Sequence, residues 1–475
     1  MNEGRKRDEP IVPMKGVNKD QAKVGPAESV EGRGSTKRKE QQLNMGQTQG
    51  WETMQNKLMV LHQKAKQDKK LHFTSLMHHV WNLDLLEKAY SSLKRNAAPG
   101  VDGQTYSEYG KALESNLIDL SGRLKRGGYR AKPVHRMYIP KRDGSKRPLG
   151  VTVLEDKIVQ KAVTMVLTTV YEADFLGFSY GFRPKRSQHQ ALDAVYAAIM
   201  TRKVRWILYA DIQNFFGKVD HSWVIKFMEH RIADRRIICL IRKWLKAGVM
   251  EQGILSYVEE GTPQGGSISS LLANIYLHYA SDLWTKQWRE RKAEGQVAVV
   301  RYADDSILGF RFKQDAESYL LELKERLIKF GLSVNQEKTQ LLEFGKYADE
   351  SRLRKGFKKP ETFEFLGFTH ICGKTVKGKF TVIRRLVKKR MREKVLKIKS
   401  ALRKRMHRKI PETGEWLKSV LVGYYRYYGV SGNLGALEQF RFSDSQKLAS
   451  RTQAPKSTTE ISKARVMTII ENMFD

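Results

Sequence analysis

The stretch RYADDSILGF (residues 301–310) decides the fold of this chain. The apolar run VAVV (297–300) leads into it, and Ile307 and Leu308 continue the apolar pattern on the far side. Two apolar runs around a short polar tip predict a β-hairpin. Asp304 and Asp305 lie side by side at that tip, where neighbouring carboxylates repel each other unless a positive group lies between them. The sequence therefore raises the question of what that positive group is.

A second strand ends in an acid. The segment WILYADIQNFF (206–216) begins as a buried strand that runs into Asp211. If this strand pairs with the hairpin, Asp211, Asp304 and Asp305 converge on one edge of a sheet. Such oxygen ligands suit Mg²⁺, and two metal ions about 3.5–4 Å apart can bind the attacking and leaving oxygens in phosphoryl transfer. The alternative for each acid taken alone is an ordinary surface aspartate.

The charge of the chain indicates its partners. Lys and Arg outnumber Asp and Glu by 87 to 51 in 475 residues, which gives a formal net charge of +36. Such an excess is typical of proteins that bind a polyanion, so nucleic acid is the first expected partner. No run of 18 apolar residues occurs, and the N-terminus lacks the apolar segment of a secretory signal, so no membrane partner is expected. Cys239 and Cys372 are too few for a disulfide framework, which indicates a reducing, intracellular setting.

The elements along the chain alternate irregularly, which predicts the α+β class. Residues 1–50 are polar and basic, and we expect a disordered tail that is either dispensable or a nonspecific RNA-binding arm. The glycine-rich turn GTPQGGSISS (261–270) is expected to open a long helix that ends near residue 292. The further expectations are a strand–turn segment over 135–150, helices over 152–172 and 314–330, two helices within 221–247, and a short strand over 363–370.

The last third of the chain becomes strongly basic. Residues 384–409 contain 14 Lys or Arg and one acid, Glu393. Apolar residues recur there at spacings of three and four, which predicts one amphipathic helix. This helix either packs on a core with a solvated outer face or lies along a nucleic-acid backbone. The scarcity of acids to pair with the cations favours the second interpretation.

Several ordered motifs resemble one enzyme family. They are APGVDG (98–103), PKRDGSKRPLG (140–150), FRPKRS (182–187), DIQNFF (211–216), TPQGGSIS (262–269), YADD (302–305), FLGF (365–368) and WLKSVLVGYYRYYGVSGN (416–433). In this order they resemble the blocks of group II intron-encoded reverse transcriptases with maturase activity, over roughly residues 75–440.

The resemblance implies a right-hand polymerase. Fingers and palm would occupy 51–375, the thumb and maturase X domain 376–445, and a short tail 446–475. Asp211, Asp304 and Asp305 would be the catalytic acids, and these three with Ile212 would hold two Mg²⁺ ions. The resemblance also implies the substrate-binding residues. Lys141 and Arg147 would hold the incoming triphosphate, Phe216 would reject a 2′-hydroxyl, Gln264 would lie near the template–nucleotide pair, and Tyr302 and Ala303 would lie beside the primer end.

Ordinary structural roles compete with some of these assignments. Lys141 and Arg147 are also consistent with surface cations in so basic a chain, and Phe216 with a core aromatic. The aromatic residues of 416–433 would either stack on unpaired RNA bases or pack with each other.

The chain departs from the family pattern at three positions. Gly217 stands where an Asp is common, Ser270 where a Pro usually opens the helix, and Ser306 where an aromatic is usual. None of the three is a metal ligand, so activity is expected to survive. No Cys/His-rich nuclease module follows residue 440, so cleavage of target DNA by this chain is not expected.

Three functions remain in competition. The first is an RNA-directed DNA polymerase that uses dNTPs and a DNA primer or target, and that also binds intron RNA as a maturase in the bacterial cytoplasm. The second is an RNA-binding splicing factor on a decayed polymerase scaffold. The third is an intron-like reverse transcriptase that serves host repair or phage defence.

Overall fold

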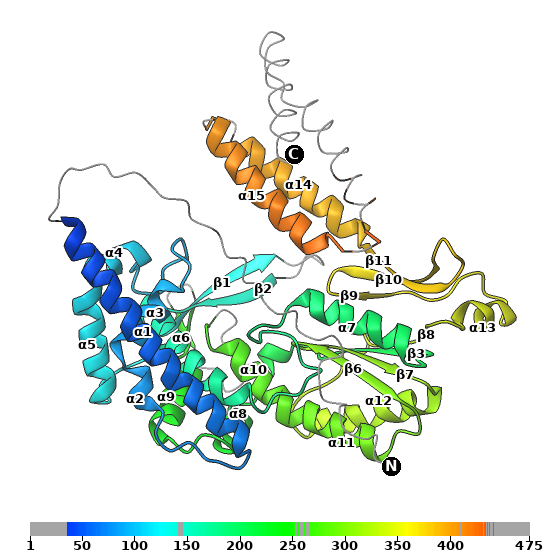
Figure 1. Cartoon of the computed structure of the whole chain (residues 1–475), viewed down its shortest axis with the longest axis horizontal. Helices are drawn as coiled ribbons and strands as arrows, with labels where there is room; N and C mark the ends of the chain where they lie inside the picture. Colours follow the sequence, from blue (N-terminus) through cyan, green and yellow to red (C-terminus); the bar gives the residue numbers. More distant parts are fainter. Residues whose placement is uncertain are drawn as a thin grey trace, which may run out of the picture.

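The computed structural model describes residues 36–440 except for 141–145, 252–253, 257–260, 262–265, 406, 409, 431, 434, 436 and 438–439. The expectations for residues 1–35 and 441–475 lie outside the described residues. Helices and strands are mixed, and the described strands form three sheets, which confirms the α+β class (Figure 1).

The central sheet contains the hairpin of the RYADDSILGF stretch, which is formed by β6 and β7. Its strand order is β6-β7-β3-β8, and every neighbouring pair is antiparallel. The predicted pairing of the two acid-bearing strands is confirmed, because Asp211 lies directly opposite Asp305. Side chains of β3 alternate between two cores, with Leu208 in one and Ile207 in the other, so both faces of the sheet are covered. The strands are β3 (Trp206–Asp211), β6 (Val297–Tyr302), β7 (Asp305–Phe310) and β8 (Gln340–Glu343).

Helices pack on both faces of the central sheet (Figure 1). Helix α7 (Gln188–Thr201) packs on β6 and β7, and Ser187 begins it with a capping box. Helix α12 (Lys313–Ile328) packs on β3 and β7 from the other side. The long helix expected before residue 292 begins at Ser269 and contains one π turn. The remaining elements of this part are η1 (Phe215–Gly217), α8 (His221–Glu229), α9 (Arg235–Leu245), α10 (Ser269–Leu277), η2 (His278–Asp282) and α11 (Leu283–Arg291).

A second lobe is formed mainly by residues that precede β3, and β4 and β5 join it from later in the chain. Its sheet has the order β2-β1-β4-β5, and α6 lies buried among the surrounding helices. Helix α1 begins at Thr36, so the expectation of disorder up to residue 50 was wrong for 36–50. Helix growth from a formed turn costs less than nucleation, which lets α1 extend through a polar segment. The elements are α1 (Thr36–Gln67), α2 (Met77–Val80), α3 (Leu83–Ser91), α4 (Tyr106–Gly110), α5 (Leu113–Lys125), β1 (Val134–Pro140), β2 (Lys146–Val151), α6 (Leu154–Tyr171), β4 (Val249–Glu251) and β5 (Ile254–Ser256).

A three-stranded sheet, β11-β10-β9, leads to the last two helices. The single strand expected over 363–370 is in fact two strands, because Leu366 and Gly367 have φ values of 47° and 86° and reverse the chain. The predicted domain boundary at 375/376 falls in the turn between β10 and β11. The elements are α13 (Ala348–Arg354), β9 (Phe363–Phe365), β10 (Phe368–Lys374), β11 (Phe380–Leu386), α14 (Lys388–Lys404) and α15 (Ile410–Tyr428).

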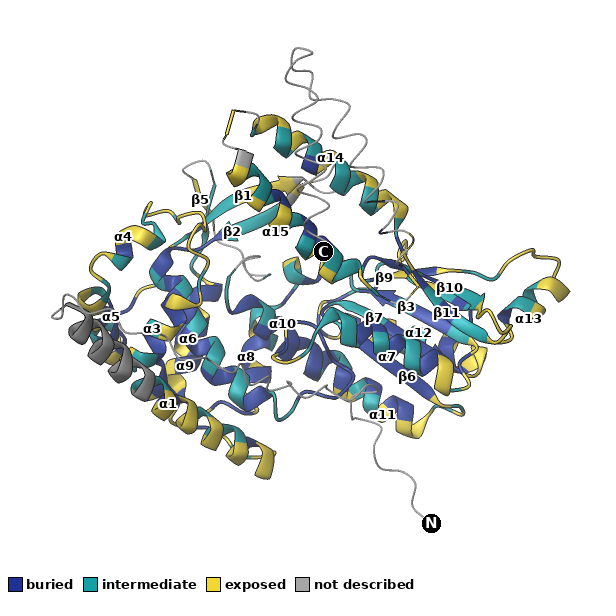
Figure 2. Cartoon of the chain, turned by 45° about the horizontal axis from the view of Figure 1, so that its top comes forward, coloured by how far each residue is buried: buried dark blue, intermediate teal, exposed yellow. Residues whose placement is uncertain are grey.

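Helices α14 and α15 pack as a pair with a common apolar core. Residues 384–386 belong to β11, so the basic helix begins four residues later than predicted. Its apolar stripe faces α15, with Ile398 buried, while its outer face is exposed (Figure 2). Tyr424 is buried and stacks on Phe440 at 4.5 Å, so packing with other aromatic residues accounts for Tyr424. In the described part of the chain, no helix is long and apolar enough to cross a membrane.

Candidate functional site

The hairpin tip has a strained backbone. Tyr302 pairs with Asp305, so Ala303 and Asp304 alone form the turn between β6 and β7. Ala303 has a φ of 56°, a conformation that two-residue hairpin turns usually give to glycine. For a residue with a Cβ this conformation costs roughly 1–2 kcal/mol. Contacts from the surrounding protein must therefore hold the turn in place.

Arg301 supplies one of these contacts. Its side chain is buried and donates a 2.9 Å hydrogen bond to the carbonyl oxygen of Ala303. Two further hydrogen bonds, of 2.7 and 2.6 Å, join its guanidinium to the carboxylate of Asp282, which is also buried. The side-chain oxygens of Asn274 and Ser179 accept further hydrogen bonds from its guanidinium. Asp282 ends the π turn in the long helix, so this turn positions the partner of Arg301.

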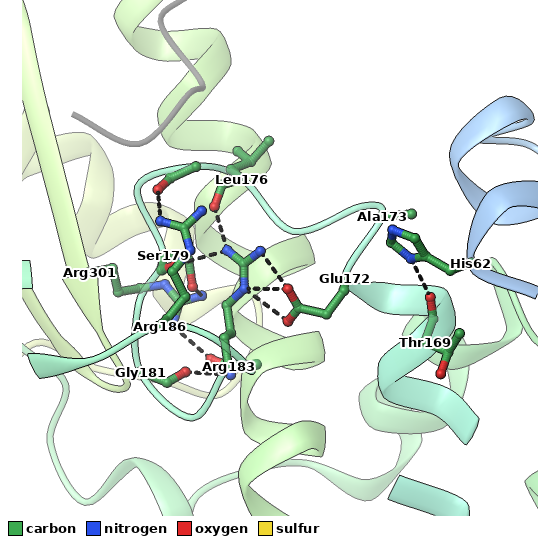
Figure 3. Close-up of polar contacts among 12 residues, drawn as sticks. His62, Thr169, Glu172, Ala173, Leu176, Ser179, Gly181, Arg183, Arg186 and Arg301 are labelled. Atoms are coloured by element: carbon green, nitrogen blue, oxygen red, sulfur yellow. Dashed lines mark hydrogen bonds and ion pairs between the residues drawn. The ribbon is translucent and has the colours of Figure 1, made fainter. Parts of the chain in front are cut away.

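A loop between α6 and α7 packs directly against the hairpin. The amide of Arg301 donates to the carbonyl of Phe178, and the amide of Tyr180 donates to the carbonyl of Arg301, each at 2.8 Å. A Cβ at Gly181 would collide with the amide nitrogen of Ala303, so only glycine allows this approach. The loop is itself held by Arg183, which binds the Glu172 carboxylate and the carbonyl oxygens of its own loop (Figure 3).

The three aspartates gather at the edge of the central sheet. Asp211 is buried, and its carboxylate forms a 2.9 Å ion pair with the ammonium of Lys338. Asp305 accepts a 2.6 Å hydrogen bond from the hydroxyl of Tyr209. Burial, together with the charges of Asp304 and Asp211, raises the pKa of Asp305 to about 6, although the Tyr209 hydrogen bond opposes this rise. Burial and the carboxylate of Asp305 raise the pKa of the Tyr209 hydroxyl, with smaller contributions from Asp211 and Asp304. The acids therefore lie close enough to repel one another.

Lys338 is a site residue that the sequence did not reveal. Asn335 builds its turn by accepting hydrogen bonds from the amides of Glu337 and Lys338, and the amide of Asn335 donates to the carbonyl of Asp211 at 2.8 Å. Burial lowers the pKa of Lys338, but the hydrogen bond and the charge of Asp211 outweigh it, so the pKa is raised. The chain has 87 Lys and Arg residues, and only the asparagine turn before β8 distinguishes this one.

The donor set suits a hard divalent cation. Its ligands would be carboxylate oxygens, which Mg²⁺ prefers, and a cation would relieve the repulsion that raises the pKa of Asp305. Within the described residues, however, no group of three or more His, Cys, Asp or Glu side chains is arranged to hold a metal ion. One carboxylate oxygen of Asp211 binds Lys338, and one of Asp305 binds Tyr209. A metal ion must therefore share these carboxylates with Lys338 and Tyr209 or displace these two partners.

Four of the other predicted site residues lie in the described structure near these acids, and the rest lie wholly or partly outside it. Phe216 is partly buried, packs edge-to-face on Phe215 and follows Asp211 by five residues. Ile212 forms an isolated bridge with Val334, next to the Lys338 turn. Tyr302 is partly buried and Ala303 is buried in the hairpin itself. Lys141, Gln264 and the side chain of Arg147 lie outside the described residues; the backbone of Arg147 pairs with Ile139 in the β1–β2 hairpin.

Gly217 and Ser306, two of the three departures, fit the local packing. A Cβ at Gly217 would lie 2.5 Å from the side chain of Asn214, and the loop at Gly261 approaches the backbone of Phe216 and Gly217 closely. Ser306 pairs with Ala210 and Arg301 inside the central sheet. Neither position contributes a ligand to the acids.

Comparison with known proteins identifies one domain. The model of the family described as "Reverse transcriptase (RNA-dependent DNA polymerase)" matches residues 139–370. This range contains Asp211, Asp304, Asp305, Lys338 and the whole Arg301 network. It ends within β10, before the basic helix α14.

Curated relatives extend the comparison. The chain is 37% identical over 257 residues to Protein YkfC of Escherichia coli (strain K12). This match covers 47% of this chain and 67% of that protein. It is 32% identical over 293 residues to the Group II intron-encoded protein LtrA of Lactococcus lactis subsp. cremoris, covering 58% of this chain and 48% of LtrA. A shorter match, 27% identical over 97 residues, covers 20% of this chain and 13% of Nuclear intron maturase 1, mitochondrial, of Arabidopsis thaliana. The chain thus spans two thirds of one relative and half or less of the other two.

Proposed function

Because this chain belongs to the reverse transcriptase family, among the group II intron-encoded proteins, we propose that it copies an RNA template into DNA from a primer 3′-hydroxyl. One observation carries the proposal: the strand pairing that sets Asp211 opposite Asp305, with Asp304 in the adjoining turn. Three clustered carboxylates at a sheet edge fit phosphoryl transfer better than they fit a structural role, because like charges in contact are unfavourable without a cation.

The proposed architecture is that of a right hand. The central sheet with Asp211 and Asp305 is the palm, and the lobe of α1–α6 with β1 and β2 forms the fingers. The three-stranded sheet with α14 and α15 forms the thumb and maturase domain. The α14–α15 pair supports this assignment, because its exposed face is rich in Lys and Arg.

Asp211, Ile212, Asp304 and Asp305 would hold the metal ions, which we take to be two Mg²⁺. When bound, such ions neutralise charge on the phosphate oxygens and favour the ionised primer hydroxyl. The residues of the chain prepare this edge: Tyr209 orients Asp305, and Arg301 with Gly181 holds the Ala303 turn. Lys338 keeps Asp211 paired until a metal competes for its oxygen.

The nucleotide would be bound by residues around these acids. We propose that Lys141 and Arg147 hold the triphosphate of the dNTP, that Phe216 excludes a 2′-hydroxyl, and that Gln264 lies near the template–nucleotide pair. Tyr302 and Ala303 would lie beside the primer end. The position of Phe216, five residues past Asp211 and packed on the core beside it, supports its role.

Intron RNA is the second proposed ligand. Relatives named as a group II intron-encoded protein and an intron maturase support a role in splicing, and the bacterial origin of two relatives supports the bacterial cytoplasm as its location. The alternative is a splicing factor that has lost synthesis, which the departures at Gly217, Ser270 and Ser306 motivate.

The test is to measure synthesis and RNA binding on the same preparation. A labelled DNA primer on a generic RNA template is incubated with dNTPs and Mg²⁺, and binding of the same template is followed without dNTPs. Template-directed extension is the expected result. Intact RNA binding with no extension at any Mg²⁺ concentration would refute the polymerase and favour the splicing factor.

A further inference from the structure

A strongly basic hollow lies at the end of the central sheet opposite the aspartates. Its volume is about 750 Å³, and six cations line it: Arg202, Lys203, Arg205, Arg311, Lys346 and Lys379. No Asp or Glu is among its lining residues. Asp211 ends β3 and Trp206 begins it, so five steps along the strand, about 17 Å, separate the two ends. The hollow is therefore distinct from the site of the three acids.

Five of the six cations of this hollow differ from nearby cations in forming no ion pair within the described residues. Lys203, Arg205, Arg311, Lys346 and Lys379 are exposed, and none of these five takes part in an ion pair within the described residues. Close by, other cations are paired: Lys313 with Glu317 at 2.7 Å, and Lys355 with Glu343 at 2.7 Å.

Helix electrostatics explain only part of the cluster. Arg202 and Lys203 directly follow α7, and cations near a helix C-terminus are favourable. Arg311 follows β7, Lys346 follows β8, and Lys379 lies in the β10–β11 turn, so these three have no such reason to converge. Elements remote in sequence thus bring like charges together, which costs free energy unless an anion binds between them.

The walls of the hollow are fixed by backbone contacts. The amide of Arg205 donates to the carbonyl of Phe310 at 2.8 Å, and the amide of Phe344 donates to the carbonyl of Arg205 at 2.9 Å. A Cβ at Gly345 would collide with the carbonyl of Val204, and the amide of Gly345 donates to the sulfur of Cys372. These contacts fix the walls of the hollow, which lies on the side of the molecule where α7 packs against β11 (Figure 1).

An aromatic residue lies at the rim of the hollow. Tyr347 is 48% exposed and also lines a neighbouring hollow that contains Trp206. The guanidinium of Arg205 lies 5.2 Å and the ammonium of Lys346 lies 5.4 Å from the centre of its ring. Exposed aromatic rings beside cations bind unpaired nucleic-acid bases by stacking while the cations bind phosphates. A purely inorganic anion or an acidic peptide would make no use of this ring.

We propose that the basic hollow is a second nucleic-acid site, which binds the phosphates of an unpaired strand while Tyr347 stacks on one of its bases. The strand would lie at the end of the sheet away from the primer terminus. Binding there would tether the RNA or DNA that the protein carries without blocking the acids. This site does not depend on polymerase activity, and its test can succeed or fail separately.

The test uses the full chain with its main nucleic-acid site filled by an excess of a short primer–template duplex. A fluorescent 12-nucleotide unpaired strand, made as RNA and as DNA, is then titrated in and followed by anisotropy. The hollow variant carries Lys203→Glu, Arg311→Glu and Lys346→Glu. The matched control carries Arg291→Glu, Lys324→Glu and Lys329→Glu, three exposed cations near the ends of α11 and α12 that lose the same charge.

The proposal predicts that only the hollow variant loses this second binding event. Three lost phosphate contacts weaken binding of a single strand by up to about 100-fold at 0.1 M salt and lower the salt slope by about 2. Tyr347→Ala should weaken binding by about tenfold with an unchanged salt slope. Extension of the short duplex should be the same in all variants. The form of the 12-nucleotide strand that binds more tightly, RNA or DNA, identifies the kind of nucleic acid that the hollow binds.

Three results would overturn the proposal. Equal loss in the control variant would mean that the strand senses only net charge. Unchanged binding in the hollow variant would place the second strand elsewhere. Displacement of the strand by polyglutamate at equal charge concentration, together with no effect of Tyr347→Ala, would mean that the hollow binds acidic polypeptides instead.

Discussion

Replacing Arg301 should separate the stability of the protein from the geometry of its catalytic turn. Arg301→Met leaves Asp282 buried without its cation, which costs about 3–5 kcal/mol of unfolding free energy. Adding Asp282→Leu removes the orphaned charge, and replacing a buried pair by apolar side chains is often neutral. The double variant should therefore recover most of the lost stability.

Activity should not recover with stability. Both variants lack the hydrogen bond that holds the carbonyl of Ala303, whose φ of 56° costs roughly 1–2 kcal/mol. If that strain is no longer offset, the productive turn is populated about 5- to 30-fold less. Single-turnover extension of a primed RNA template at saturating dNTP should slow by this factor in the double variant.

The assay pairs urea unfolding with single-turnover extension on the same preparations. Asp193→Asn, which removes the partner of Arg384 outside the turn, serves as a control for the loss of an ion pair. A double variant that regains both its stability and its full extension rate would refute the reasoning, because Arg301 would then act only through folding.

Three further predictions follow from the site and its surroundings. Lys338→Met should lower the Mg²⁺ concentration for half-maximal extension about fivefold, since a partly exposed ion pair worth about 1 kcal/mol no longer competes for Asp211; a higher Mg²⁺ requirement would contradict this. Phe216→Ala should raise the incorporation of ribonucleotides relative to deoxyribonucleotides by up to about 100-fold in competition assays, and an unchanged ratio would remove Phe216 from sugar selection. Burial lowers the pKa of His370 to about 3, so the unfolded chain protonates first and His370 costs stability as the pH falls from 6.5 toward 3. Urea unfolding of His370→Leu should therefore show a stability gain over the unaltered protein that grows by up to about 1.4 kcal/mol per pH unit in this window, whereas a constant difference would show that His370 does not titrate there.

The hairpin and its partner strand were predictable because their signals are local. The apolar run before Tyr302 and the acids after it define the hairpin, and the segment before Asp211 reads as a strand by the same rule. The sequence predicted that the three acids would converge if the two strands paired. The pairing of Asp211 with Asp305 confirms that convergence and supplies the register, which the sequence did not predict.

The parts of the site that were missed depend on distant partners. Arg301 donates a hydrogen bond to Ser179, which lies 122 residues earlier in the chain, and Lys338 donates one to Asp211, 127 residues earlier. No local pattern marks Arg301 among the cations of this basic chain, and the asparagine turn before β8 does not by itself reveal that Lys338 pairs with Asp211. The turn at Leu366 was missed for a different reason: leucine rarely adopts a positive φ, so FLGF reads as one strand instead of two.

Backbone context also changed the expected ends of elements. Residues 36–50 have the composition of a disordered segment, yet they continue a helix whose later part packs on α6 and α3. The basic helix begins at Lys388 because residues 380–386 pair with β10. Composition describes the average residue of a segment, whereas packing decides where its structure starts.

The central claim is that the clustered aspartates bind the metal ions that drive DNA synthesis. The most direct measurement compares Mg²⁺-dependent primer extension on an RNA template by the unaltered protein and by Asp304→Ala. Glu337→Gln serves as the matched control, because Glu337 is an exposed acid in the Lys338 turn. The account predicts extension by the unaltered protein and the control, and none by Asp304→Ala with its RNA binding intact. Equal synthesis by Asp304→Ala would contradict it.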